Sequence, residues 1–395
     1  MSDRRILPAR PDLRRLRDEA KARRCSGEFP SLALAHLAIA REYGFVSWPR
    51  LKLHIDALSL SAADRAQALV RSACSSNLRQ ARTLLDADPA LGRHDLAAAC
   101  VSGEAAYVAE RLEHAPHLAR TVAPPLHREP ILYACFSRLL RGDPERAPGI
   151  REVVRLLLAA GADPNAAFDH EGWRQVPLYG SAGIVNDAEV TRMVLDAGAD
   201  PNDDDDRHSV GEALYHACEF PDPICAAMLI DGGTNPEVVT YCLGRVLNFP
   251  DPAMAEMFCA HGARATGSNL HQAVARRRPA GTVRALLSAG APIGAPDEAG
   301  LTALRIATRW GEAEMAAFLI GVGADPAAVT DEDRAFGDLL TGAAGPSPGD
   351  RARARGGDLD EMLDMAIQGG RVDAVTHLLD AGALVDGAPG GEHPP

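Results

Sequence analysis

The sequence predicts an all-α protein built from stacked helix–turn–helix units. A nearly identical segment occurs twice, as LLLAAGADPN (156–165) and MVLDAGADPN (193–202). A glycine also recurs after an apolar helical stripe at intervals close to 33 residues. The recurring glycines are Gly161, Gly198, Gly233, Gly262, Gly290, Gly323 and Gly382. Such a period is typical of a solenoid, in which each unit buries its apolar face against its neighbours.

Each recurring glycine follows a helix whose apolar residues share one face. In the first clear copy these residues are Val153, Leu156 and Leu157. Glycine ends such a helix because it adopts the left-handed conformation without a side-chain clash. The Asp-Pro that follows several of these glycines favours a turn. We therefore expect each of these helices to be the second helix of its unit.

A shorter first helix is predicted upstream of each of these second helices. Its start recurs as ILYAC (131–135), PLYGSAG (177–183), ALYHAC (213–218), NLHQAV (269–274) and ALRIAT (303–308). The expected order within a unit is therefore helix, turn, helix, loop.

These motifs resemble the ankyrin repeat, whose first helix opens with Thr-Pro-Leu-His-x-Ala and whose second helix closes with a Gly-Ala-Asp turn. The resemblance spans approximately residues 63–386 and implies an ankyrin-repeat solenoid that binds partners on its concave face and finger loops. The family's histidine is kept as His271 and replaced by Tyr133, Tyr179, Tyr215 and Arg305. That histidine has a structural hydrogen-bonding role in the family, so the tyrosines are expected to serve the scaffold.

An N-terminal helical module is predicted ahead of the repeats. Leu13 and Leu16 have helical spacing under a basic face, and two further helices follow, broken at Gly44 and capped by Ser47. With its motifs LPARP (7–11) and AIAREYGFVSWPRLK (38–52), the module resembles the leader found ahead of many bacterial ankyrin-repeat proteins. It either caps the open end of the repeat array or uses its basic helix to bind a membrane or a partner.

The expected organisation has five parts. They are an N-terminal helical module at 1–58, an ankyrin-like repeat array at 59–342, a flexible linker at 343–357, a terminal repeat at 358–386 and a disordered tail at 387–395.

Charge limits the class of partner. The formal net charge is −13 at pH 7, and residues 1–24 carry nine Arg or Lys against four Asp or Glu. The rest of the chain is therefore strongly acidic. Nucleic-acid binding needs clustered basic residues, so we expect no nucleic-acid partner and favour a basic or neutral protein. No apolar run is long enough for a membrane span.

The sequence predicts neither a metal nor a cofactor. The Gly-x-Gly in GVGADP (321–326) follows a helix instead of a strand, and His114 and His117 lack other ligands nearby in the sequence. The eight cysteines form no C-x-x-C pair, and several sit at the small-residue position of a first helix. They are expected to be buried thiols of a cytoplasmic protein.

One loop is longer than the repeat requires. The inserted segment AAFDHEGWRQV (166–176) carries Asp169, His170, Trp173 and Arg174, and the next loop carries DDDD (203–206). Loop tips have no packing role, so these residues are candidates for binding. The four aspartates are either a solvated loop, an electrostatic attraction for a basic partner, or a magnesium or calcium site.

A polar row is predicted on the first helices. Aligning EFPDP (219–223) with NFPDP (248–252) places His216 opposite Arg245 and Glu219 opposite Asn248, and the next unit adds Gln272. The row is either part of a groove or a solvated helix face with local hydrogen bonds.

Two functions remain open. In the first, the protein is an interaction scaffold, because aromatic and arginine side chains dominate interface energy. The candidate binding residues are Trp173, Arg174, Arg245, Asn248, His271 and Gln272. In the second, a pocket binds a small molecule or performs acid/base chemistry. The candidate catalytic residues are His216 or His170 as base, Glu219 or Asp169 as orienting group, and Tyr179 or Tyr215 as acid. No nucleophile elbow, metal set or phosphate loop accompanies them, so the sequence favours the scaffold.

Overall fold

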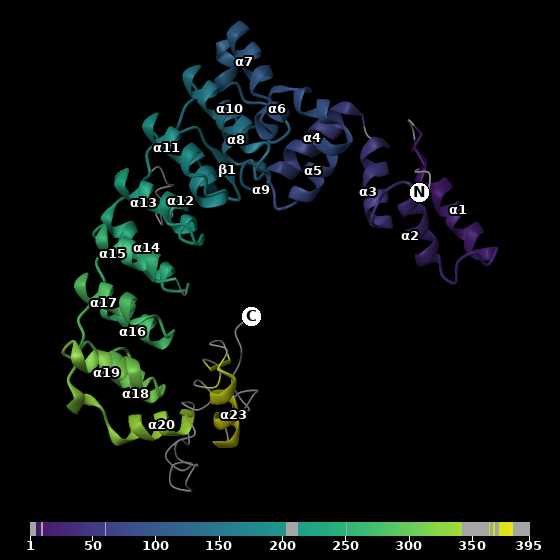
Figure 1. Cartoon of the computed structure of the whole chain (residues 1–395). Helices are drawn as coiled ribbons and strands as arrows, with labels where there is room; N and C mark the ends of the chain where they lie inside the picture. Colours follow the sequence, from purple (N-terminus) through teal and green to yellow (C-terminus); the bar gives the residue numbers. More distant parts are fainter. Residues whose placement is uncertain are drawn as a thin grey trace. The chain divides into compact units, whose positions relative to one another are not determined.

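The computed structural model describes residues 5–8, 11–59, 61–202, 212–249, 251–341, 363, 366–367 and 371–381. The chain divides into two compact units, Met1–Ala217 and Cys218–Pro395. Figure 1 colours the helices of both units in sequence order, from purple at the N-terminus to yellow at the C-terminus.

Three helices begin the first unit: α1 (Leu13–Cys25), α2 (Leu32–Glu42) and α3 (Trp48–Ser59). Gly44, whose φ is 84°, lies just after the end of α2 and separates it from α3, as expected. The three helices share one hydrophobic cluster that includes Leu16, Ile39 and Leu51, with Trp48 packed at its side. Leu16 thus belongs to a core within the module, and α3 also contacts α5 of the first repeat.

Helical repeats occupy the rest of the first unit. Their elements are α4 (Ala62–Ala73), α5 (Leu78–Ala87), η1 (Pro89–Arg93), α6 (Leu96–Ser102), α7 (Ala105–His114), η2 (Pro116–Arg120), α8 (Pro130–Cys135), α9 (Leu139–Gly142), α10 (Ala147–Ala159), β1 (Phe168–His170), β2 (Trp173–Gln175), η3 (Tyr179–Ile184), α11 (Ala188–Asp196) and α12 (Glu212–Ala217). First helices stack on first helices in the order α4, α6, α8, η3 and α12, and second helices stack in the order α7, α10 and α11. We call these two layers inner and outer.

The second unit repeats the same arrangement. Its elements are α13 (Ile224–Asp231), α14 (Pro236–Val246), α15 (Pro252–Ala260), α16 (Gly267–Ala275), α17 (Ala280–Ser288), α18 (Ala303–Arg309), α19 (Ala313–Gly321), η4 (Pro326–Ala328), α20 (Asp331–Thr341) and α23 (Val372–Ala381). Inner helices α14, α16 and α18 stack in order, and α15 packs on α17 in the outer layer.

The all-α repeat solenoid predicted from the sequence is confirmed. Six of the seven recurring glycines have a φ between 88° and 107°, which is the left-handed conformation expected after each second helix. Gly382, the seventh, lies outside the described residues. The linker at 343–357, the tail at 387–395 and DDDD (203–206) also lie outside them, and the terminal repeat is described only in part.

Two elements have structure that the sequence did not specify. The inserted finger, expected as a longer loop, forms a two-stranded antiparallel hairpin, β1–β2. The inner helix at PLYGSAG contains a π-helical turn, η3, in which each backbone N–H reaches one residue further back than in an α-helix. Gly180 and Gly183 permit this turn to pack closely, because a Cβ at either position would lie within 3.0 Å of an aromatic ring atom.

Inner-helix cysteines form part of the core. Cys100 and Cys135 in the first unit and Cys218 and Cys242 in the second are buried, and Cys74 is partly buried. All eight cysteines are thiols in the structure. The expectation of core thiols at this repeat position is therefore confirmed.

Candidate functional site

The hairpin β1–β2 is built around a two-residue turn. His170 pairs with Trp173, which leaves Glu171 and Gly172 as the turn residues, with φ values of 56° and 87°. Two successive residues with positive φ define the turn type whose twist matches antiparallel strands. The N–H of Gly172 donates to Asp169 Oδ1 at 3.1 Å, which stabilises the turn from within.

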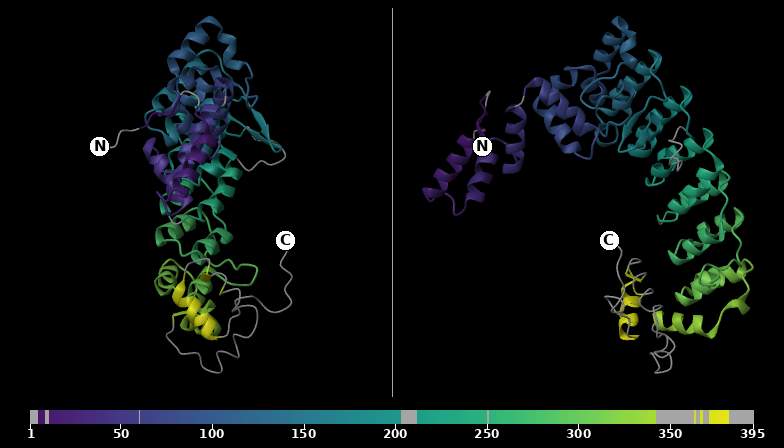
Figure 2. Two further views of the ribbon diagram at one scale, coloured as in Figure 1. Left: turned by 90° about the vertical axis from the view of Figure 1, so that its right-hand side faces the viewer. Right: turned by 180° about the vertical axis from the view of Figure 1, so that it is seen from behind.

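The tip of the hairpin is exposed, whereas its base is packed. Trp173 is 37% exposed, and Asp169, His170 and Glu171 are exposed as well. At the base, Gln175 is buried. The teal strands project from the helices of their unit in the left view of Figure 2. The hairpin therefore presents an indole ring among titratable side chains.

Arg174 lies on the packed part of the hairpin. Its Nη2 donates to the backbone oxygen of Asn165 at 3.3 Å, and the side chain is partly buried. This contact joins β2 to the turn that precedes the insertion. Arg174 is thus less available to a partner than its neighbour Trp173.

A second cluster surrounds His216 on the inner helices of the first unit. The His216 ring lies 5.3 Å from the ring of Tyr179, on η3, and 5.3 Å from that of Tyr215, on α12. Its Nε2 lies 3.3 Å from Glu212 Oε2, one helical turn earlier. The structure therefore brings His216 and both nominated tyrosines together.

Glu212, which was not among the nominated carboxylates, contacts His216. Asp169 and His170 lie on the hairpin, and Glu219 belongs to the second unit. The i, i+4 spacing of Glu212 and His216 on a helix was the available sequence signal for this contact.

The second unit contains the rest of the predicted row. Arg245, at the end of α14, forms an ion pair with Glu219, and its guanidinium carbon lies 5.5 Å from the Phe249 ring centroid. Gln272 Nε2 donates to Gly244 O and to Asn248 Oδ1, both at 3.1 Å. Gln272 and Asn248 thus take part in hydrogen bonds that join α14 to α16.

His271 has a structural contact. It is 9% exposed, and its Nε2 lies 2.8 Å from the backbone oxygen of Ala295, in the loop that follows α17. Sequence reasoning did not nominate Tyr241, which is 55% exposed on α14, four residues before Arg245. Its helical spacing from Arg245 places both side chains on one face.

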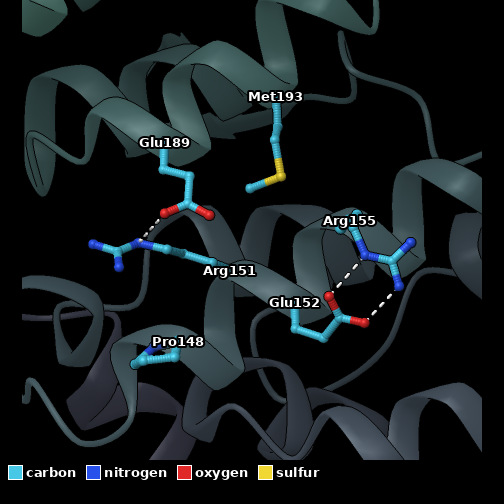
Figure 3. A pocket seen from close by; sticks show the side chains of 6 residues that line it. All are labelled: Pro148, Arg151, Glu152, Arg155, Glu189 and Met193. Carbon is cyan, nitrogen blue, oxygen red and sulfur yellow. Dashed lines mark hydrogen bonds and ion pairs between the residues drawn. The ribbon is translucent and has the colours of Figure 1, made fainter.

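Two cavities lie away from all of these residues. A cavity of about 160 Å³ between α10 and α11 is lined by Pro148, Arg151, Glu152, Arg155, Glu189 and Met193 (Figure 3). Its charged groups form ion pairs with one another. Arg151 Nε lies 3.5 Å from Glu189, and Arg155 forms an ion pair with Glu152. A cavity of about 300 Å³ in the second unit is lined by Thr308, Gly311, Glu312, Ala313, Ala316, Arg334, Gly337, Asp338 and Thr341.

Among the residues that the structure describes, no three His, Cys, Asp or Glu side chains are placed to hold a metal ion together. None of the helices that the structure describes has both the length and the apolarity needed to span a bilayer.

Comparison with known proteins identifies the repeat. Residues 270–320, from α16 to α19, match the family described as "Ankyrin repeats (many copies)". No curated protein matches the chain. The solved structures similar to it include the ankyrin repeat domain of Bcl-3, a unique member of the IκB protein family, at 25% identity and a TM-score of 0.38, covering 49% of this chain and 86% of that one. The human ASB11 ankyrin repeat domain is also similar, at 16% identity and a TM-score of 0.42, covering 58% and 98%.

The matched segment, residues 270–320, is thus similar to ankyrin repeats, and the helical repeat solenoid fits this likeness. Ankyrin repeats generally mediate protein–protein interactions.

Proposed function

We propose that this chain is an interaction scaffold that binds a protein partner on the concave face and finger loops of its repeats. The observation that carries the proposal is the hairpin β1–β2, which the repeat does not need and which exposes Trp173. Tryptophan is enriched among the residues that dominate interface energy, since it buries a large area with few rotatable bonds.

Charge supports a basic partner. The formal net charge of the chain is −13, and the hairpin adds the exposed carboxylates Asp169 and Glu171 beside Trp173. An acidic surface attracts a basic protein over long range and raises its association rate. In the second unit, Tyr241 and Arg245 supply the aromatic and cationic groups expected at an interface.

Two further parts of the proposal concern context. The thiol state of all eight cysteines supports a reducing compartment such as the cytoplasm. The three-helix module with its own core supports its assignment as a leader of the type found in bacterial ankyrin-repeat proteins.

Trp173→Ala tests the scaffold. A partner recovered by pulldown and identified by mass spectrometry is purified, and its affinity is measured by calorimetry. Because Trp173 lies on the exposed part of the hairpin, the melting temperature should stay nearly unchanged, while the binding free energy weakens by about 2 kcal/mol or more. Tyr107→Ala, on outer helix α7, is the matched aromatic control. A loss of stability with unchanged affinity would assign Trp173 to structure and refute the proposal.

The Glu212–His216 contact supports a second candidate function. A histidine held by a carboxylate between two tyrosines has the groups needed for acid/base chemistry on a small molecule. His216→Ala should then abolish turnover of a substrate found in the host's metabolite pool while binding persists. An unchanged rate in His216→Ala would rule this function out.

A further inference from the structure

The solvent-facing side of α1 carries a row of positive charges. Arg14, Arg17, Lys21 and Arg24 follow one another at spacings of three, four and three residues, which places them on one face of the helix. All four residues are exposed. The apolar side of the same helix, which includes Leu16, is buried in the core of the module. We call the four cations the basic stripe.

The residues that the structure describes leave the basic stripe with a net positive charge. Lys21 Nζ lies 3.3 Å from Asp18, but both side chains are largely exposed, and an ion pair in solvent is weak. The side chains of Arg14, Arg17 and Arg24 form no ion pair with any residue in the described ranges. A surface of this kind attracts an anionic partner.

Two carboxylates of the module are already bound by other arginines. Arg5 Nη1 lies 2.7 Å from Glu19 and 2.8 Å from Glu42. Arg23 Nη2 donates to the same two carboxylates, at 2.7 Å and 3.1 Å. Because each carboxylate accepts from two guanidinium groups, neither is available to the basic stripe. The network also holds the segment that precedes α1 against α1 and α2.

Two aliphatic side chains of the module project into solvent. Ile6 is 92% exposed, and Val46 is 76% exposed. Ile6 follows Arg5, whose N–H donates to the backbone oxygen of Glu42 at 2.9 Å, and Val46 lies four residues beyond Glu42. Both side chains therefore flank the C-terminal end of α2. Apolar side chains with this exposure gain free energy when they leave water.

We propose that the N-terminal module binds the surface of an anionic phospholipid membrane. The basic stripe contacts the charged groups of the lipids, and Ile6 and Val46 enter the apolar boundary beneath them. Helix α1 lies on the surface and does not enter the bilayer, because its apolar side is used in the core of the module. The exposed aliphatic side chains favour a lipid surface over a nucleic acid, since a phosphodiester chain in water offers them no apolar phase. This inference does not depend on the scaffold function.

Vesicle co-sedimentation of the full chain tests the proposal. The vesicles contain either phosphatidylcholine alone or the same lipid mixed with phosphatidylserine. The chain should bind the mixed vesicles at least about tenfold more tightly, because the basic stripe needs anionic lipid. Binding should weaken as salt is added, since ions screen this attraction. A sample without vesicles measures self-association of the chain.

Variants connect the binding to the basic stripe. Arg14→Gln, Arg17→Gln and Arg24→Gln combined should weaken binding to the mixed vesicles about a hundredfold, since each cation near an anionic surface contributes about fivefold. These side chains are exposed, so the variant should keep the helix content of the wild type. Circular dichroism checks this.

A matched control removes the same charge from the repeats. Arg79→Gln, Arg192→Gln and Arg264→Gln combined change three exposed arginines outside the module and should leave vesicle binding nearly unchanged. Ile6→Ser with Val46→Ser keeps the charge and should weaken binding at least about tenfold, because it removes the apolar contribution.

Several results would overturn the proposal. Equal binding to both kinds of vesicle, or binding that survives in the glutamine variant of the basic stripe, would remove the electrostatic contact. Serine variants that bind like the wild type would remove the apolar contact. Tighter binding to a single-stranded oligonucleotide than to the mixed vesicles would assign the basic stripe to nucleic acid. Self-association that the glutamine variant abolishes, without vesicle binding in the wild type, would assign the stripe to a second copy of the chain.

Discussion

Asp333 is a fully buried carboxylate held by two arginines of the neighbouring inner helix. Its oxygens lie 2.8 Å from Arg305 Nε and 3.3 Å from Arg309 Nη1, and Oδ2 accepts from the N–H of Thr330 at 2.9 Å. The side chain is 0% exposed. Arg305 occupies the position at which the ankyrin pattern has histidine. This position therefore keeps a structural hydrogen-bonding role, although the residue type differs.

Asp333→Asn should destabilise the second unit. Removing the charge leaves Arg305 and Arg309 without their partner, which costs about 3 kcal/mol in the free energy of unfolding for a buried pair. Chemical denaturation measures this loss. Asp331→Asn is the matched control, because Asp331 lies on the same helix with its side chain 95% exposed. Equal stability of the two variants would contradict a structural role for the Asp333 cluster.

The same carboxylate predicts a pH dependence. Burial by itself would raise the pKa of Asp333, but hydrogen bonds from Arg305 and Thr330 outweigh it and lower the pKa below 3.8. A lowered folded-state pKa gives stability that is present above 3.8 and lost as pH falls through the lower value. Thermal melts between neutral and acid pH should therefore show a steeper loss for the wild type than for Asp333→Asn. Parallel curves would show that Asp333 does not contribute to acid sensitivity.

Tyr133 provides a further structural contact at the residue scale. Its hydroxyl donates to Ala123 O at 2.6 Å and accepts from the N–H of Leu126 at 3.0 Å. The phenol thus holds the loop before α8, as the structural histidine does in the family pattern that the sequence resembles. These bonds also position Arg128, whose backbone pairs with the same Ala123.

Among the elements, the N-terminal module depends on Leu16. This residue is buried between α1 and its partners, and α3 is the helix that also contacts the first repeat, through α5. Leu16→Asp should destabilise the module by about 1–3 kcal/mol, because it buries a charge and removes an apolar contact. Ala22→Asp adds the same charge at an exposed position of α1 and should be nearly neutral.

The outcome of this test separates the two roles of the module. Loss of helical signal on heating measures stability, and liposome or partner association measures binding. If Leu16→Asp keeps its stability and loses only association, then α1 is a binding helix and its assignment to a core is wrong.

The repeat helices were predictable because three local signals coincide: apolar spacing, the terminal glycine and the Asp-Pro turn. The hairpin gave a weaker signal. Its strands have only three residues each, and its turn is Glu171-Gly172, whereas Asn-Gly or Asp-Gly marks such turns more clearly. Its length and polar content nevertheless identified it as an insertion. The sequence therefore predicted where the insertion lies, but not that it forms a β-hairpin.

The sites were predictable only in part. His216, Tyr179 and Tyr215 were all nominated for a possible acid/base pocket, and their rings do lie together. The contact of Arg128 with the Phe168 ring was not foreseen, since the two residues lie 40 positions apart in the sequence and at unlike positions of the repeat. A periodic pattern indicates which positions of successive repeats are equivalent. It does not indicate which residues at non-equivalent positions contact each other between repeats.

At the scale of the whole molecule, the stability of a repeat array depends on how the apolar surface of its end repeats is covered. In the second unit α20 packs against α23, where Leu340 is buried and its backbone oxygen lies 3.1 Å from His377 Nδ1. Arg371, just before α23, donates to the backbone oxygen of Trp310 at 2.9 Å. The last described helix thus covers apolar surface of the helices before it.

A chain cut after Gly357 should therefore aggregate. The cut removes α23 and uncovers Leu340 together with Phe336, and newly exposed apolar patches promote self-association. Light scattering and analytical centrifugation measure the aggregation, and thermal melting measures the accompanying loss of stability. A cut after Gly390, within the C-terminal tail, is the control, because it shortens the chain without removing α23. A chain ending at Gly357 that remains monomeric with an unchanged melting temperature would show that α23 is not the cap of the array.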